Sequence, residues 1–175
     1  VVVQHDGKIL VAGTSFNGVD DDFALVRYNP DGGLDDTFNG DGKVITAIGS
    51  GDDAGYSVTL QPDGKILVSG SSFNGASDDF ALVRYNADGS LDNTFGDDGI
   101  LTTAIGAGRD LGYGVAVQSN GEILVAGSSS DGTRSDFALA RYNPDGSLVW
   151  GGARYTENES PVLLASAATI FDTDL

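Results

Sequence analysis

The chain of 175 residues is strongly acidic, because 26 Asp and Glu residues against 9 Lys and Arg residues give a net charge of −17. Such a surface repels phosphate groups, which disfavours binding to nucleic acid and to anionic membrane surfaces. The absence of cysteine excludes disulfides and thiolate metal sites, and no apolar run approaches the roughly 20 residues of a membrane span.

One unit occurs three times along the chain with a constant period of 57 residues. The first block begins at Gln4, Gln61 and Gln118 and reads Gln-x-Asp/Asn-Gly-Lys/Glu-Ile-Leu-Val-Ala/Ser-Gly. A second block, Asp-Phe-Ala-Leu-Val/Ala-Arg-Tyr-Asn, begins at Asp22 and returns at the same spacing. A fixed period of this length predicts one supersecondary unit stacked on copies of itself.

In the second copy, four segments have the pattern of β-strands. Residues 56–61 alternate polar and apolar side chains, and 65–71 is β-branched and apolar. The turn Pro62–Gly64 lies between them and predicts a hairpin. Residues 79–86 and 100–105 complete the set, and no segment has helical periodicity.

The third strand predicts how these units pack. Phe80, Leu82 and Arg84 face one side of it, and the residues between them, also largely apolar, face the other. A strand buried on both faces fits a sheet packed between two neighbours, as in a β-propeller. A β-solenoid or an extended array of hairpins is the alternative.

We therefore predict an all-β chain of three tandem four-stranded propeller-type blades. The predicted divisions are 1–57, 58–114, a truncated third blade at 115–153 and a C-terminal segment at 154–175. Closed propellers usually need about four to eight blades, so this one is incomplete. The two uncovered faces predict head-to-tail contacts, which close into rings or propagate as filaments. The predicted partners are other copies of the chain or adjoining blades of the same protein.

The third copy departs from the repeat after Leu148. Where the first copy continues Asp35-Asp36-Thr37-Phe38, the third reads Val149-Trp150-Gly151-Gly152. The apolar stretch 162–171 either supplies the missing fourth strand of this blade or inserts into another subunit as a donated strand. The candidate assembly residues are Val162, Leu163, Leu164, Ile170 and Phe171.

The repeat resembles a known family. The pattern Val-x-Val-Gln-x-Asp-Gly-Lys-Ile-Leu-Val-Ala-Gly, followed by Asp-Phe-Ala-Leu-Val-Arg-Tyr-Asn-Pro-Asp-Gly-Ser-Leu-Asp-x-Thr-Phe-Gly, is similar to the bacterial delta-sixty repeat over about residues 1–150. The resemblance implies a β-propeller architecture and an extracellular or cell-surface setting in bacteria, and it implies no chemistry. The tail, with Tyr155-Thr156-Glu157-Asn158 and a closing Asp172-Thr173-Asp174, resembles the opening of bacterial cadherin-like repeats, whose carboxylates commonly bind calcium.

Catalysis has little support in these residues. The single histidine, His5, occupies a turn position held by Pro62 and Ser119 in the other copies. Most acidic residues recur in register, as turn formers do, whereas an active site normally breaks internal symmetry. An ion pair between Asp22 and Arg27 across neighbouring blades is our structural hypothesis for one such acid.

The sequence favours calcium binding over catalysis, because two Gly-rich loops contain several side chains with the hard oxygen atoms that bind calcium. Solvated turns are the alternative for each loop taken alone. The candidates are Asp35, Asp36, Asn39 and Asp41 in the first loop, and Asp92, Asn93, Asp97 and Asp98 in the second.

Three functions follow in order of preference. The first is a non-catalytic structural module that assembles head-to-tail. The second is a calcium-dependent adhesin module that binds glycan or protein. The third is a fragment of a propeller hydrolase, which a buried carboxylate pair confined to one copy would favour.

Overall fold

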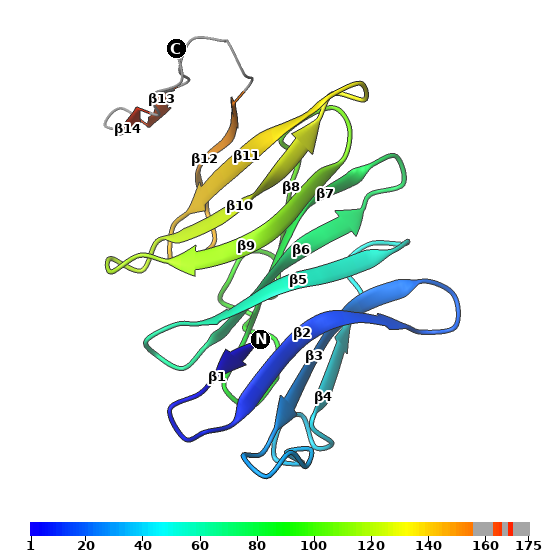
Figure 1. Cartoon of the computed structure of the whole chain (residues 1–175), viewed down its shortest axis with the longest axis vertical. Coiled ribbons are helices and arrows are strands. Elements are labelled where there is room, and N and C mark those ends of the chain that lie inside the picture. The colour runs from blue at the N-terminus through cyan, green and yellow to red at the C-terminus, as the bar shows by residue number, and fades with distance from the viewer. Residues whose placement is uncertain (156–162, 166–167, 170–175) are drawn as a thin grey trace.

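The computed structural model describes residues 1–155, 163–165 and 168–169, with side chains described as far as Val149. Three four-stranded antiparallel sheets follow one another along the long axis of the molecule and form an open array (Figure 1). This confirms the predicted all-β fold of three tandem blades. No helix occurs among the described residues, so none of them supplies a helix able to cross a membrane.

Each blade takes its four strands in sequence order. Blade 1 contains β1 (Val2–Val3), β2 (Ile9–Phe16), β3 (Asp21–Tyr28) and β4 (Lys43–Thr46). Blade 2 contains β5 (Asp53–Leu60), β6 (Ile66–Phe73), β7 (Asp78–Tyr85) and β8 (Ile100–Thr103). Blade 3 contains β9 (Asp110–Val117), β10 (Ile123–Ser130), β11 (Ser135–Tyr142) and β12 (Leu148–Tyr155), and β13 (Leu163–Ala165) pairs with β14 (Ala168–Thr169) in a separate sheet.

The first strands of blades 2 and 3 start earlier than the divisions at 57/58 and 114/115 placed them. Strand β5 begins at Asp53, and its pairing with β6 continues across a β-bulge between Gly55 and Ser57. The small residues Ala54 and Gly55 and the bulge interrupt the alternation of side chains, which hid this part of the strand in the sequence.

The fourth strand of blade 3 corrects one prediction. Strand β12 pairs with β11, so residues 148–155 fill the position that we assigned to the apolar stretch 162–171. Leu163 and Leu164 lie in β13, and Val162, Ile170 and Phe171 lie outside the described residues. Donation of this stretch to a neighbouring subunit stays a prediction.

The hydrophobic core lies between neighbouring sheets. We call the face of a blade that meets the following blade its outgoing face, and the face that meets the preceding blade its incoming face. Between blades 2 and 3, the outgoing face consists of Leu67, Phe80, Leu82 and Phe95, and the incoming face of Ile123, Val125, Ala138, Ala140 and Tyr142. The same positions one repeat earlier form the core between blades 1 and 2. The prediction that the third strand is buried on both faces is confirmed for β7.

Candidate functional site

An arginine on the third strand of blade 1 joins it to blade 2. The Nε atom of Arg27 donates to the carboxylate of Asp35 at 2.6 Å, and its Nη1 atom donates to the main-chain oxygen of Ala87 in blade 2 at 2.7 Å. The guanidinium also lies over the ring of Phe38, 4.5 Å from its centroid. One side chain thus combines a buried ion pair, a cation–π contact and a charge-assisted hydrogen bond to the next blade.

The same contacts recur one repeat later. Arg84 donates to Asp92 at 2.6 Å and to the main-chain oxygen of Pro144 in blade 3 at 2.5 Å, and it lies 4.3 Å from the ring centroid of Phe95. Because both copies use the same atoms, this set of contacts is the repeated joint of the array.

The carboxylate of this joint is held in its ionised form. Hydrogen bonds from Lys8, at 2.8 Å, and from Thr37 hold the pKa of Asp35 well below its usual range, and Arg27 adds to the effect. In the second copy, burial opposes ionisation of Asp92, but the bonds from Lys65 and Thr94 outweigh it and lower the pKa. The joint therefore depends on a negative charge shared by two cations.

A tyrosine from the following blade completes the joint. The hydroxyl of Tyr85 lies 2.8 Å from the Thr46 hydroxyl of blade 1, and Tyr142 donates to Thr103 at 2.8 Å one repeat on. Burial raises the pKa of each tyrosine to about 12. Both hydroxyls are thus protonated donors or acceptors within the core.

The phenylalanine of the joint rests on a turn glycine of the next blade. A Cβ added at Gly89 would lie 3.0 Å from the ring of Phe38, and one added at Gly146 would lie 3.0 Å from the ring of Phe95. The two glycines have φ angles of +94° and +91°, a region that L side chains rarely adopt. Glycine therefore serves both the turn and the close approach of the neighbouring ring.

The third copy rearranges the charges of this site. Val149 stands where Asp35 and Asp92 stand in the other copies, and Glu122 stands where they have Lys8 and Lys65. The Nη1 atom of Arg141 lies 3.3 Å from a carboxylate oxygen of Glu122. The arginine keeps a carboxylate partner, but this partner now comes from the turn immediately before β10.

The predicted pairing of Asp22 with Arg27 is wrong. Arg27 is paired with Asp35 of its own blade at 2.6 Å, so its ion pair does not cross to an aspartate of a neighbouring blade. Asp22 instead accepts a hydrogen bond from the side-chain amide of Asn17 at 2.8 Å. The partner of the arginine, Asp35, arrives from the loop that follows the strand.

The calcium candidates do not gather into one cluster. Asp35 and Asp92 are engaged by lysine and arginine, and Asp41 accepts a hydrogen bond from the main-chain nitrogen of Lys43. Among the described residues, no group of three or more His, Cys, Asp or Glu side chains is placed to hold a metal ion. The remaining candidates, Asp36, Asn39, Asn93, Asp97 and Asp98, lie in the same two loops.

The other acidic residues recur in register. In each copy the turn aspartate, Asp31, Asp88 or Asp145, accepts a hydrogen bond from the main-chain nitrogen two residues later. Buried carboxylates come in pairs one repeat apart, such as Asp53 and Asp110. The exposed His5 lies in a turn, as predicted.

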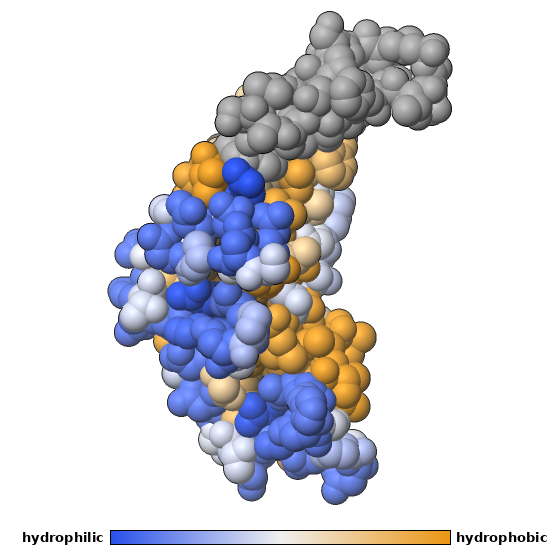
Figure 2. Space-filling view, turned by 90° about the vertical axis from the view of Figure 1, so that its left-hand side faces the viewer, coloured by the Kyte–Doolittle hydropathy of each residue, from blue (hydrophilic) through white to orange (hydrophobic). Residues whose placement is uncertain are grey.

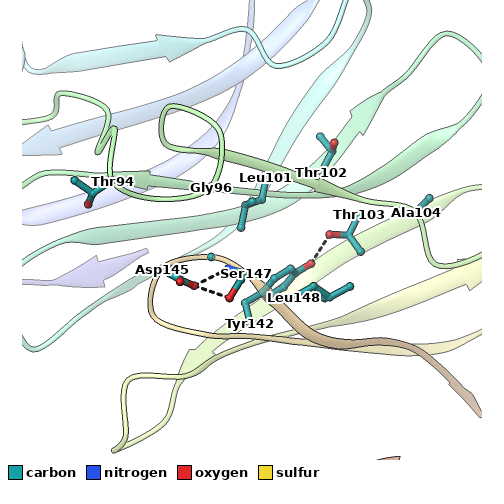
Figure 3. Close-up of a pocket in the computed structure, with 11 residues that line it drawn as sticks. Thr94, Gly96, Leu101, Thr102, Thr103, Ala104, Tyr142, Asp145, Ser147 and Leu148 are labelled. Atoms are coloured by element: carbon teal, nitrogen blue, oxygen red, sulfur yellow. Dashed lines mark hydrogen bonds between the residues drawn. The ribbon is translucent and has the colours of Figure 1, made fainter.

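Two pockets lie where blades 2 and 3 meet. One, of about 750 Å³, is lined by Thr103, Tyr142, Asp145 and Ser147 among others. Figure 3 shows Tyr142 hydrogen-bonded to Thr103 and, separately, Ser147 hydrogen-bonded to Asp145. The other, of about 340 Å³, is lined by residues that include Tyr56, Ser71, Phe73, Asp78 and Arg109.

The second pocket has features that suit a ligand. Tyr56 is 42% exposed, and its ring centroid lies 5.5 Å from that of Tyr113, which is 53% exposed. An ion pair of 2.6 Å between Arg109 and Asp78 forms another wall. This pair of tyrosines was not predicted from the sequence, although their spacing of one repeat places them at the same position of β5 and β9.

The matches to known proteins concern the repeat itself. A family model described as a domain of unknown function (DUF5122) beta-propeller matches residues 4–38, 61–95 and 118–148. These matches cover more than half of the chain and fall at the same place in each blade. No curated protein matches the chain.

Proposed function

We propose that this chain, which belongs to the DUF5122 β-propeller family, is a structural and interaction module that works without catalysis. Membership of this family indicates an architecture and no activity, because one fold can serve many functions. The resemblance to the bacterial delta-sixty repeat and of the tail to cadherin-like repeats supports an extracellular or cell-surface setting. The net charge of −17 argues against nucleic acid as a partner.

The observation that carries this proposal is the apolar face left uncovered at each end of the array. Val11 on the incoming face of blade 1 is 38% exposed, whereas the equivalent Val68 is 1% exposed within the array. On the outgoing face of blade 3, Phe137 is 45% exposed, whereas Phe80 is 1% exposed. Figure 2 shows hydrophobic residues gathered along one edge of the side in view, beside a mostly hydrophilic surface.

Such faces bury their side chains by meeting further blades, either of other copies or adjoining in the same protein. A contact of this kind is head-to-tail, so it closes into a ring or continues as a filament. The stretch 162–171 adds a donated strand to a neighbouring subunit in this proposal.

Sedimentation of the full chain over a range of concentrations tests the proposal. The mass is expected to rise above the 17.9 kDa of one chain as the concentration rises. The substitution Val11→Lys places a charge on the incoming face and should suppress this rise, whereas Val19→Lys, at a loop residue that is 86% exposed, should not. A mass that stays at one chain at every concentration, or that ignores Val11→Lys, would contradict the proposal.

The pocket lined by Tyr56, whose ring lies against that of Tyr113, supports a second candidate function, that of an adhesin module that binds glycan. Exposed aromatic rings beside a few polar groups are the usual composition of a small-ligand site. Calorimetric titration with neutral oligosaccharides, in calcium and then in chelator, tests both parts of this candidate. Binding should be lost in Tyr56→Ala and kept in Phe16→Ala, whose ring is 67% exposed in blade 1.

A further inference from the structure

The outgoing side of blade 3 lacks most of the joint. The third strand of each blade carries a phenylalanine, Phe23 or Phe80 in blades 1 and 2, and a tyrosine five residues later, and each pairs with a residue further along the chain. In blades 1 and 2, 11 residues lie between these two pairing partners, namely 35–45 and 92–102. Blade 3 places only the six residues 149–154 between the same two partners. The loop that carries the aspartate, threonine and phenylalanine of the joint is therefore reduced to a continuous strand.

The position of the carboxylate in the joint changes together with this loop. In blades 1 and 2 the carboxylate of the joint lies on this loop, where the threonine and phenylalanine accompany it. In blade 3 the carboxylate is that of Glu122, before β10, and Glu122 and Val149 differ from the other copies together. Arg141 therefore keeps an ion pair with a carboxylate although blade 3 lacks the loop. Blade 3 forms this ion pair without the outgoing half of the joint.

The incoming half of the joint is intact in blade 1. Tyr28 occupies the position of Tyr85 and Tyr142, but it is half-buried whereas they are fully buried. Gly32 occupies the position of Gly89 and Gly146 with a φ of +89°, and a Cβ added there would meet no atom within 4 Å. The place filled by a phenylalanine ring in the two internal joints is open in front of blade 1.

We infer that the array is directional: blade 1 accepts a blade with an intact outgoing half, and it binds such a blade more tightly than it binds the reduced outgoing side of blade 3. The partner of blade 1 is a repeat of the same type with three features. It has a lysine just before its second strand and an arginine on its third strand. The loop after that third strand carries Asp-x-Thr-Phe. This inference rests on the proposed function, because it names the partner and the direction of that blade contact.

Two full-length donors that differ only in the third repeat test the inference. Both carry Val11→Lys, which blocks their own incoming face. The restored donor also carries Glu122→Lys, and its residues 148–155 are replaced by a copy of residues 91–103. Each donor is titrated into fluorescently labelled native chain, and the dissociation constant is measured by sedimentation.

The restored donor is expected to bind native chain at least about tenfold more tightly than the matched donor, which corresponds to about 1.4 kcal/mol. Labelled Val11→Lys chain should bind neither donor, and Tyr28→Phe should weaken binding of the restored donor. Equal affinity of the two donors would overturn the inference and leave the proposed function standing. Absence of binding by both donors would overturn the stacking of blades itself.

An internal variant tests the same chemistry without relying on the restored donor to fold. Lys65→Glu together with Asp92→Val gives blade 2 the outgoing charges of blade 3. The joint between blades 2 and 3 should weaken, and the midpoint of thermal unfolding should fall by several degrees relative to native chain. An unchanged midpoint would show that the two charge arrangements join blades equally well, and it would overturn the inference.

Discussion

The guanidinium of Arg84 and the main-chain oxygen of Pro144 lie 2.5 Å apart, and this hydrogen bond crosses from blade 2 to blade 3. A carbonyl oxygen is present whatever side chain the turn carries, and the equivalent acceptor one repeat earlier belongs to Ala87. The joint therefore tolerates sequence change in the turn while it depends on the arginine.

Removal of the arginine should be costly. In Arg84→Ala the carboxylate of Asp92, whose side chain is 4% exposed, keeps only the lysine as a cation. Loss of one partner of a buried ion pair costs about 3 kcal/mol, and urea unfolding measures this loss. The control is Arg109→Ala, which removes an ion pair whose arginine is 67% exposed and should cost less than about 1 kcal/mol. Similar losses in the two variants would show that the joint adds little to stability.

Two glycines with the same backbone conformation should respond differently to alanine. Gly32 and Gly89 have φ angles of +89° and +94°, so both variants bear a similar backbone cost of about 1 kcal/mol or more. Gly89→Ala also pushes a methyl group against the ring of Phe38, which adds about 1 to 3 kcal/mol. Thermal unfolding of the two variants measures the difference, and equal losses would mean that the ring does not rest on this turn in solution.

Much of the fold could be predicted from the sequence, because it depends on regular spacings of residues along the chain. The 57-residue repeat indicated the blades, and the apolar residues on both faces of 79–86 indicated that the third strand is buried on both sides. The Asp-Gly turns were predicted by local hydrogen bonding alone. Each of these features is local, so it leaves a regular trace in the chain.

The features that were not predicted depend on contacts across a loop. Asp35 reaches Arg27 only because the chain reverses after the strand, whereas recurrence in register suggested Asp22. Strand β12 contains Gly151 and Gly152 and lacks clear alternation, so the more apolar stretch 162–171 was preferred to it. The sequence shows that Glu122 replaces the lysine of the other two copies and that Val149 replaces their aspartate. Only the structure shows that both positions belong to the surroundings of one arginine, Arg141.

Stability at high pH should depend on the buried tyrosines of the joint. Their pKa is raised to about 12 in the folded chain, above the value of about 10 in an unfolded chain. This contribution is complete below about pH 10 and is lost as the pH rises through the folded value. The double variant Tyr85→Phe, Tyr142→Phe should be less stable at pH 7, by about 1 kcal/mol for each lost hydrogen bond. Its free energy of unfolding should fall less between pH 10 and 12, and a fall as steep as in native chain would contradict this assignment.

Stability at low pH should depend on the carboxylates of the joint. The folded pKa values of Asp35 and Asp92 lie well below the unfolded value of about 3.9. Their contribution is therefore complete above about pH 4 and is lost as the pH falls toward the folded values. The double variant Asp35→Asn, Asp92→Asn should be less stable than native chain at pH 7, and its free energy of unfolding should decline less below pH 4. Denaturant unfolding at pH 7, 5, 4 and 3 measures both curves. Parallel curves would mean that these carboxylates are not ion-paired in solution, because each pair in the joint must lose its attraction when the carboxylate is protonated.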